Sequence, residues 1–376
     1  MVFWWCLLEH RWEMFLRSLA IVILIVNIFS CKEGDSNLVN QPSTTEPRAD
    51  STFDVIHAIS EDLYNGNGTW GRGFDYRMAL RDSYWRADVY GEITDNNDIY
   101  FERTKEVHAY LMLSQAEGGS GVFGFPADIN NPEFGEVVNR VLTECPECIN
   151  NGWVVSLPGD DVAELYYDHG YALVSLVKGY LNTNDSYYLS SIMDAADWIL
   201  NKPLHSNVNY LSALSKGLSY AYRATGDLRY LDRAIFLHEQ GIFPNLSRET
   251  GGALDSHNQQ LEYHGFIVSG IIALKSALPS QHDYHATVDR FLNLSISHMQ
   301  QRNMLEDGSY GVTWPGTNLL AWHELEKLRE LTSDEKMARD RCIDFINSYK
   351  ESIVNESDFR LQKSLYSNFF IGLYPD

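Results

Sequence analysis

Basic residues are scarce in this chain. Lys and Arg together number 29 against 51 Asp and Glu, and the formal net charge is −22. A protein that binds nucleic acid needs a basic stripe to displace counterions from the phosphates, and the sequence contains none. The composition therefore argues against a nucleic-acid partner. The acidity alone says little about the fold.

Cysteine is also rare, at five residues. Cys145 and Cys148 are spaced as half of a zinc site, but no second such pair and no paired histidines follow at a matching spacing. The sequence therefore predicts no metal and no other cofactor. In an oxidising compartment, a local disulfide between these two cysteines is the better explanation of the motif.

Long apolar runs are absent except for residues 19–29, which follow Arg17 and end at Ser30-Cys31. The run is too short for an ordinary membrane-spanning helix and is typical of a signal peptide. A small residue before a cysteine resembles a lipobox, so we expect a signal peptide over 1–30 and a lipid on Cys31. A true N-terminal membrane anchor is the alternative.

The residues after this leader lack a hydrophobic period over 32–50, which predicts a flexible tether over 31–50 and one domain over 51–376. The sequence thus predicts an exported lipoprotein in the outer membrane, at the cell surface or in the periplasm of a Gram-negative bacterium. Its only membrane contact would be the lipid on Cys31.

Strand-like alternation is scarce, whereas apolar residues recur at three- and four-residue steps along most of the chain. Residues 161–181 are one such helix, preceded by Asp160 at the position of an N-cap. A small sheet is expected within 119–160. Further helices are predicted at about 52–64, 77–92, 99–116, 185–201, 207–224, 227–240, 257–278, 285–301, 317–331, 335–350 and 360–372.

A weak internal repeat links two of these helix pairs. Thr183-Asn184-Asp185 followed by Tyr188-Leu189 recurs as Thr225-Gly226-Asp227 followed by Tyr230-Leu231. Stacked helix pairs that bury their inner helices make solenoids or closed toroids. Residues 266–274 are apolar nearly all round, as an inner helix must be. The predicted fold is an all-α toroid or incomplete barrel of helical hairpins.

Aromatic and glycine residues are frequent in the long connections at 117–159, 241–256 and 302–316, and near the N-terminus at 68–73. Long loops in a compact domain are usually functional, and aromatic rings pack well against the C–H faces of sugars. These connections predict a carbohydrate site, with ordinary packing as the alternative. The aromatic residues concerned are Trp70, Phe123, Phe125, Trp153, Tyr310 and Trp314.

A polar cluster occurs at the start of the helix expected over 257–278. On that helix, His257, Leu261 and His264 would share one stripe, and Asn258, Glu262 and Gly265 the adjacent one. A core helix has no structural need for so many polar groups, because each must find a partner when buried. The cluster therefore predicts a site, although a satisfied polar network between helices would also explain it.

Three further groups could carry chemistry. Tyr167, Asp168 and His169 lie on an inner helix, where His169 alone would more often be a core residue. Arg302 precedes a glycine-flanked Tyr310, a position that presents a reactive hydroxyl. A basic group in this acidic chain contains Arg72, Arg77, Arg81 and Arg86, which could instead be a solvated surface.

Together, the toroid, the leader and these motifs resemble the α/α-toroid polysaccharide lyases that cut uronate polymers, with polysaccharide lyase family 38 the nearest in size. In toroid alginate lyases an adjacent Asn and His precede an Arg and then a Tyr. Here His257-Asn258, in the reverse order, precede Arg302 and Tyr310. The resemblance implies β-elimination on an anionic polysaccharide such as alginate or glucuronan, without a cofactor.

The resemblance also implies roles for the residues. Asn258 with His257 or His264 would stabilise the charge that develops on the substrate carboxylate. Tyr310 would take the C5 proton and return it to the leaving oxygen, helped by Arg302, which favours the phenolate. The expected substrate-binding residues are Trp70, Arg72, Arg77, Trp153, Tyr167, Asp168, His169, Glu262, Tyr263 and Trp314.

Three alternatives remain open at this point. A glycoside hydrolase, including an unsaturated uronyl hydrolase, needs two carboxylates, and Asp75, Asp161, Asp168 and Glu262 are candidates. A sugar epimerase on this fold is usually cytosolic, which fits an exported chain less well. A glycan-binding lipoprotein without catalysis would keep Trp70, Trp153 and Trp314. The overall negative charge argues against an anionic substrate unless the arginines offset it locally.

Overall fold

The computed structural model describes residues 58, 61, 64–69, 98–131, 135–159, 162–303 and 315–348. The chain divides into two compact units, Met1–Ala49 and Asp50–Asp376, and every described residue belongs to the second. The predicted leader, Cys31 and the tether lie outside the described residues. So do the helix predicted at 360–372 and nearly all of those predicted at 52–64 and 77–92. Within the described part of the chain, no helix combines the length and the apolar character needed to cross a membrane.

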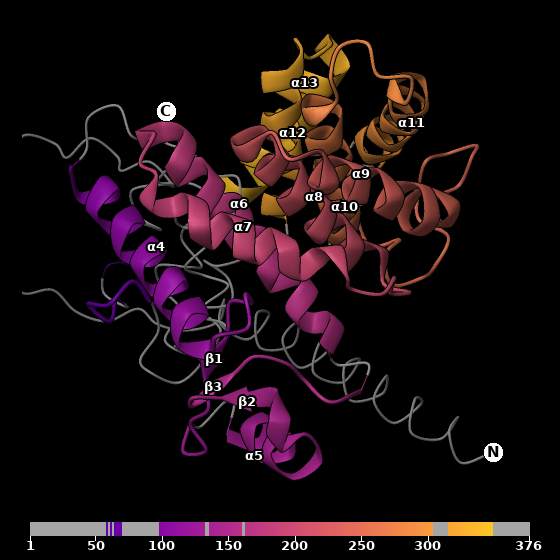
Figure 1. Cartoon of the computed structure of the whole chain (residues 1–376). Helices are drawn as coiled ribbons and strands as arrows, with labels where there is room; N and C mark the ends of the chain where they lie inside the picture. Colours follow the sequence, from indigo (N-terminus) through magenta and orange to yellow (C-terminus); the bar gives the residue numbers. More distant parts are fainter. Residues whose placement is uncertain are drawn as a thin grey trace, which may run out of the picture. The chain divides into compact units, whose positions relative to one another are not determined.

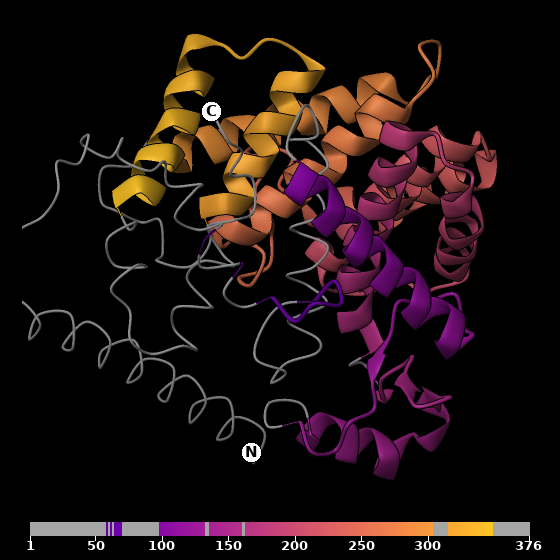
Figure 2. The same cartoon turned by 90° about the vertical axis from the view of Figure 1, so that its left-hand side faces the viewer.

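Helices dominate the described residues, as predicted. Four inner helices lie side by side in chain order, α6 against α8, α8 against α10 and α10 against α12, and each is followed by an outer helix that packs on it. This is the arrangement of an α/α toroid (Figures 1 and 2). The inner helices are α6 (Val162–Thr183), α8 (Val208–Thr225), α10 (Leu261–Ala277) and α12 (Pro315–Leu328), and the outer helices are α7 (Tyr187–Leu200), α9 (Leu228–Leu237), α11 (His285–Asn303) and α13 (Ser333–Ser348).

The inner helices approach one another closely because glycines face the neighbouring backbone. A Cβ on Gly170 of α6 would collide with the carbonyl of Ala213 in α8, and one on Gly265 of α10 would meet Thr317 of α12. The inner helices are buried almost all round, which explains why their sequences lack a polar stripe. Residues 266–274, predicted as part of an inner helix, lie within α10.

The internal repeat forms the turn between an inner and an outer helix. Thr183 donates to the Gly179 carbonyl (2.7 Å) and accepts from the Asp185 amide (3.3 Å), and Asp185 then accepts from the Tyr187 amide (2.9 Å). Thr225 and Asp227 make the same three bonds, with Ala221 and Arg229 as partners. Asn184 and Gly226 supply the left-handed residue that ends each inner helix, with φ of 55° and 72°.

Helix α4 (Asp98–Gly118) packs on α6 and leads into an insertion lobe, residues 119–159. The lobe holds the predicted small sheet, in the order β1-β3-β2, and its own small apolar cluster around Phe125 and Val138. In both views it lies at one end of α4, apart from α11 and α13 (Figures 1 and 2). Its elements are β1 (Phe125–Pro126), α5 (Gly135–Glu144), the 3-10 turn η1 (Pro146–Cys148), β2 (Ile149–Asn150) and β3 (Trp153–Val154).

Two expectations about element boundaries were wrong. Residues 117–159 were expected as a loop region, but they contain α5, whose short apolar stripe rests on Val138 and Val141. The helix expected from residue 257 starts at Leu261, because residues 255–260 form turns in which Asp255 accepts from the amide of Asn258 (2.8 Å). The end of the helix predicted at 227–240 departs less: α9 ends at Leu237 and continues as a π-helical turn, η3 (His238–Ile242), and a 3-10 turn, η4 (Phe243–Asn245).

Candidate functional site at the N-terminal ends of the inner helices

The inner helices α6, α8, α10 and α12 run in the same direction, so their N-terminal ends meet. The Asn209 amide in the first turn of α8 donates to Asn258 just before α10 (3.2 Å), and Gly265 near the start of α10 lies against Thr317 near the start of α12. The long connections 241–256 and 302–316 also reach the inner helices at this end. The candidate site is therefore at the N-terminal ends of the inner helices.

Aromatic rings from adjacent inner helices are in contact at this end. Tyr167 of α6 has its ring centroid 5.1 Å from Phe266 of α10 and 6.2 Å from Tyr210 of α8. His205, in the turn before α8, stacks on Tyr210 with the centroids 5.8 Å apart. Tyr167 is nearly buried, whereas Tyr210 and His205 are partly exposed. The rings thus run from the core out to the rim.

A second ring pair lies at the start of α10. His257 stacks on Tyr263 at a centroid distance of 4.2 Å and an interplanar angle of 24°. His257 is exposed and Tyr263 is partly exposed. Because His257 precedes the helix, it does not share a helical stripe with His264, and that expectation was wrong.

Asn258 is almost fully buried, and both ends of its side-chain amide are engaged. Its nitrogen donates to the two carboxylate oxygens of Asp255, at 3.0 Å each, and its oxygen accepts from the Asn209 amide. No side-chain hydrogen bond from the helix's own N-cap residue, Asn207, serves α8, so Asn258 satisfies one of the free amides of that helix end from another segment. Its observed role is to join the 255–260 turns to α8.

His264 faces the outer helix α11. Its Nε2 donates to the Ser295 carbonyl (3.0 Å), and its ring lies 4.9 Å from that of His298. Complete burial, together with smaller contributions from the nearby His298 and Arg302, lowers the pKa of His264 to about 4. Arg302 lies in the last turn of α11, partly exposed. The expected grouping of His264 with His257 and Asn258 on one helix face was therefore wrong.

His169 and Trp153 are packed into the interior. His169 accepts from the Phe123 amide (3.3 Å) and donates to the Ala195 carbonyl (2.9 Å), and burial lowers its pKa to about 3. The indole of Trp153 donates to Glu117 (2.7 Å) within the insertion lobe and α4. Both side chains have a satisfied structural role. Asp168, beside His169 in α6, is a fully buried carboxylate near this end of the bundle.

Several predicted site residues fall outside the described residues. Glu262 belongs to α10, but only its backbone is described. The others are Trp70, Arg72, Asp75, Arg77, Asp161, Tyr310 and Trp314.

Sequence reasoning missed the amides of the first helical turns. Asn209 in α8 and Asn318 in α12 are each 1% exposed, and the side-chain oxygen of each lacks a hydrogen-bond partner. A buried oxygen without a partner is costly, and a ligand hydroxyl would satisfy it. The missed signal is positional, because Asn209, Tyr210 and Asn318 all occupy the first turn of an inner helix.

A buried ion pair crosses the middle of the inner helices. Lys216 of α8 lies 2.5 Å from Glu324 of α12 and donates to Ser269 of α10 (2.8 Å), and Ser269 also donates to Glu324. Lys216 is 1% exposed. Both charges are taken up within this cluster, which joins three inner helices halfway along their length.

Beyond the ion pair, a cavity of about 500 Å³ lies at the opposite, C-terminal ends of the inner helices. Cations line it, each close to the end of an inner helix, where they offset the negative end of the helix dipole. We place the candidate site at the other end because the stacked His–Tyr rings and the unpartnered amide oxygens of Asn209 and Asn318 lie there. The lining residues are Lys178, Leu181, Asn182, Tyr220, Arg223, Ile272, Ala273, Ser276, Glu324, Lys327 and Leu328.

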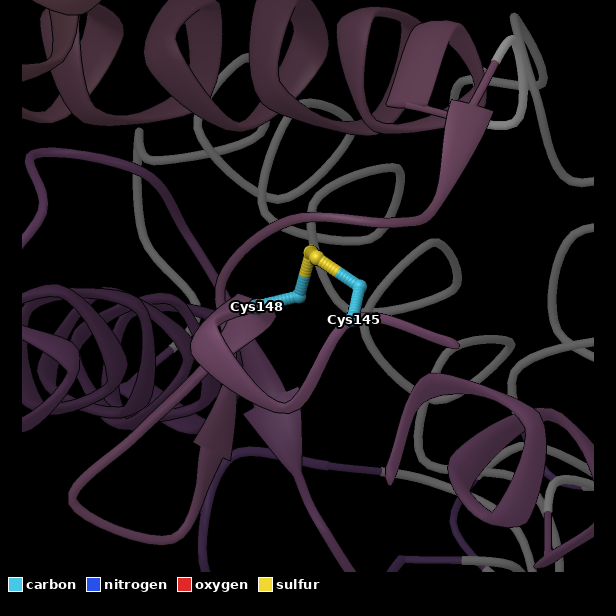
Figure 3. The surroundings of a disulfide bond; sticks show 2 residues. All are labelled: Cys145 and Cys148. Carbon is cyan, nitrogen blue, oxygen red and sulfur yellow. A yellow bond between two sulfur atoms is a disulfide. The ribbon is translucent and has the colours of Figure 1, made fainter. Parts of the chain in front are cut away.

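Cys145 and Cys148 form the expected disulfide, which lies against the apolar cluster of the insertion lobe (Figure 3). The bond removes both thiolates as zinc ligands. Within the described parts of the chain, no group of three or more His, Cys, Asp or Glu side chains could hold a metal ion.

Comparison with known proteins adds the fold but no close relative. No protein-family model and no curated protein sequence matches this chain. In fold it is similar to a polysaccharide lyase, with a TM-score of 0.51 and 11% identity over 85% of this chain and 95% of that chain. It is also similar to a glycosyl hydrolase of family 88 from Bacteroides vulgatus, with a TM-score of 0.54 and 9% identity over 85% of this chain and 96% of that chain. A third similar structure is an α-1,6-mannanase of Salegentibacter, with a TM-score of 0.54 and 12% identity over 86% of this chain and 99% of that chain.

Proposed function

We propose that this chain is an enzyme that degrades a polysaccharide, with its site at the N-terminal ends of the inner helices. The observation that carries the proposal is the grouping of partly exposed rings with two buried, unpartnered amide oxygens at that end. Aromatic rings pack on the C–H faces of sugars, and amide oxygens accept hydrogen bonds from sugar hydroxyl groups. Among the structures of similar fold, a polysaccharide lyase, a family 88 glycosyl hydrolase and an α-1,6-mannanase support this class of function, while sugar epimerases share the fold as well.

The reaction we propose is β-elimination on a uronate polymer. Tyr310 takes the proton from C5 of the uronate while the bond from C4 to the glycosidic oxygen breaks. The same tyrosine then gives the proton to the leaving oxygen. Arg302 precedes Tyr310 in the chain, and we assign to its guanidinium the role of favouring the phenolate. Because Asp255 and Asn209 occupy the amide of Asn258, we assign the binding of the substrate carboxylate to exposed His257 and to Arg302, and a positioning role to Asn258.

Hydrolysis is the second candidate, and one observation favours it. The α-1,6-mannanase was solved with mannotetrose as an inactive variant in which two adjacent aspartates are replaced by alanine. The present chain has one pair of adjacent aspartates, Asp160-Asp161, directly before inner helix α6. In a hydrolase these two aspartates would supply the carboxylates that flank the glycosidic bond. Asp168, about two helical turns further along the chain, is a further candidate carboxylate.

We further propose that the protein is exported and lipidated on Cys31, as the leader and tether predict. A lipid-anchored enzyme meets polymers outside the cell, which fits degradation of a polysaccharide. Labelling with a radioactive or clickable fatty acid in a Gram-negative host checks this, and we expect the label to be lost in Cys31→Ser.

The test of the reaction is incubation of residues 51–376 with alginate, glucuronan, pectate, ulvan and α-1,6-mannan. Rising ultraviolet absorbance reports the unsaturated end that elimination creates, and new reducing ends without absorbance report hydrolysis. We expect absorbance to rise on a uronate polymer and to be abolished by Tyr310→Phe, with Arg223→Gln at the opposite end as the matched control. Loss in Asp160→Asn/Asp161→Asn without absorbance would establish the hydrolase instead.

A further inference from the structure

Two ring pairs at the candidate site are built alike. In each, a histidine stacks on a tyrosine of the first turn of an inner helix: His205 on Tyr210 of α8, and His257 on Tyr263 of α10. The ring centroids lie 5.8 Å apart in the first pair and 4.2 Å apart in the second. His257 is exposed and the other three rings are partly exposed, so each pair presents ring surface to a ligand.

A clasp of hydrogen bonds holds the two pairs at a fixed separation. Asp255 binds the Asn258 amide, and Asn258 binds the backbone of Asn209. Asn209 directly precedes Tyr210, and Asn258 directly follows His257. The clasp therefore joins the two pairs through neighbouring residues, and neither pair can shift along the rim independently.

The surroundings of both pairs are suited to a sugar chain. His205 accepts from the Asn207 amide at Nδ1 (3.0 Å), so its Nε2 carries the proton and can donate to a ligand oxygen. Leu204 beside His205 and Leu254 beside Asp255 are 40% and 59% exposed. Large apolar side chains on both segments add C–H contact area next to the rings.

We infer that His205–Tyr210 and His257–Tyr263 form a two-part platform that binds two separate sugar units of one polysaccharide chain. The inference rests on the proposed function for the identity of the ligand. It assigns binding to His205 and Tyr210, and it makes the clasp residue Asp255 a positioning residue. A ligand that spans both pairs gains from each, so affinity rises with chain length until both are covered.

The test distinguishes a role of the rings in binding the ligand from a role in holding the fold. We will compare His205→Ala and His205→Phe, and Tyr210→Ala and Tyr210→Phe, in residues 51–376 by gel retardation in the same five polysaccharides and by KM on any that is cleaved. The phenylalanine variants keep a stacking ring. Tyr187→Ala, which removes an exposed ring at the opposite end of the helices, is the control. Thermal melting of each variant checks the fold.

We expect the alanine variants to lose about 5- to 10-fold in affinity, equivalent to roughly 1–1.4 kcal/mol, while the phenylalanine variants retain most of it. Asp255→Asn should weaken binding of long chains more than of short oligosaccharides. Wild-type affinity in folded alanine variants would overturn the platform even if cleavage is found. Retardation that depends on the rings without any cleavage would keep the platform and overturn the enzyme. Absence of retardation on all five polymers would overturn both.

Discussion

The same four inner helices end in two different chemical environments. At their N-terminal ends lie rings, amides and a buried carboxylate, reached by long connections. At their C-terminal ends lie cations and a cavity. Short turns such as 183–187 and 225–229 join the inner helices to the outer helices there. The cations complement the helix dipoles there. The comparison teaches that the open volume and the ring pairs are separate features at opposite ends of the same helices, and our proposal places the site at the ring pairs.

Acid should weaken both ends together, and this is the largest effect expected. Burial lowers the pKa of His108, His238 and His264 to about 4 and that of His169 to about 3, from 6.5 in the unfolded chain. Folding therefore keeps these rings neutral, and stability is lost as the pH falls from 6.5 toward 4. Urea unfolding between about pH 7 and about pH 5 should show a loss of roughly 1–2 kcal/mol for each histidine.

The control for this prediction is His264→Gln, which keeps a donor for the Ser295 carbonyl but cannot titrate. It should flatten the pH dependence by the share of one histidine. A free energy of unfolding that stays constant over that pH range would contradict the assignment of neutral, buried rings.

Breaking the ion pair between the two ends has the next largest effect. Lys216→Met leaves Glu324 as a buried charge and should cost about 3–5 kcal/mol, measured by urea unfolding. The double variant Lys216→Met/Glu324→Leu should recover much of that loss. Lys275→Met, which removes an outer ion pair with Asp289, is the matched control and should cost less than about 1 kcal/mol. Equal losses in the two lysine variants would show that the central pair is no more important than a surface pair.

Loss of the disulfide should destabilise the insertion lobe alone, and this is the smallest effect that we expect. The bond closes a very short loop, so its loss should cost about 2 kcal/mol or less. Hydrogen exchange of Cys145→Ser/Cys148→Ser should rise in α5 and the small sheet, whose apolar cluster contains Cys148. Exchange in α10 and α12 should stay unchanged, with Cys342→Ser, at the buried cysteine of α13 outside the disulfide, as the control. Faster exchange across the inner helices would mean that the lobe is no separate unit.

The helices could be predicted because their burial follows a 3.6-residue period that the sequence displays directly. The expected helix at 285–301 lies at 285–303, and that at 99–116 lies at 98–118. The start of α10 could not be predicted, because residues 255–260 are all polar and carry no apolar period, while Asp255 and Asn258 bind each other in a turn. Local side-chain bonds of this kind compete with the helix and leave no periodic signal.

The candidate site was predictable in place more than in detail. Tyr167 and Tyr263 were expected to bind substrate, and both lie at the N-terminal end of the inner helices, although their role stays a prediction. His169 and His264 were expected there too, but both bind backbone carbonyls of outer helices. The sequence could not separate these cases, because a polar residue on an inner helix can face either the axis or the outer layer.

The repeated turns between inner and outer helices have a consequence for how the chain could be rebuilt. Thr183-Asn184-Asp185 and Thr225-Gly226-Asp227 make the same bonds to the same backbone positions. They are therefore equivalent connectors, and we expect one turn to replace the other without altering the helices on either side. Two helix pairs are thus joined by the same turn, so new loops could be grafted at the opposite end of these pairs while the two joints stay as they are.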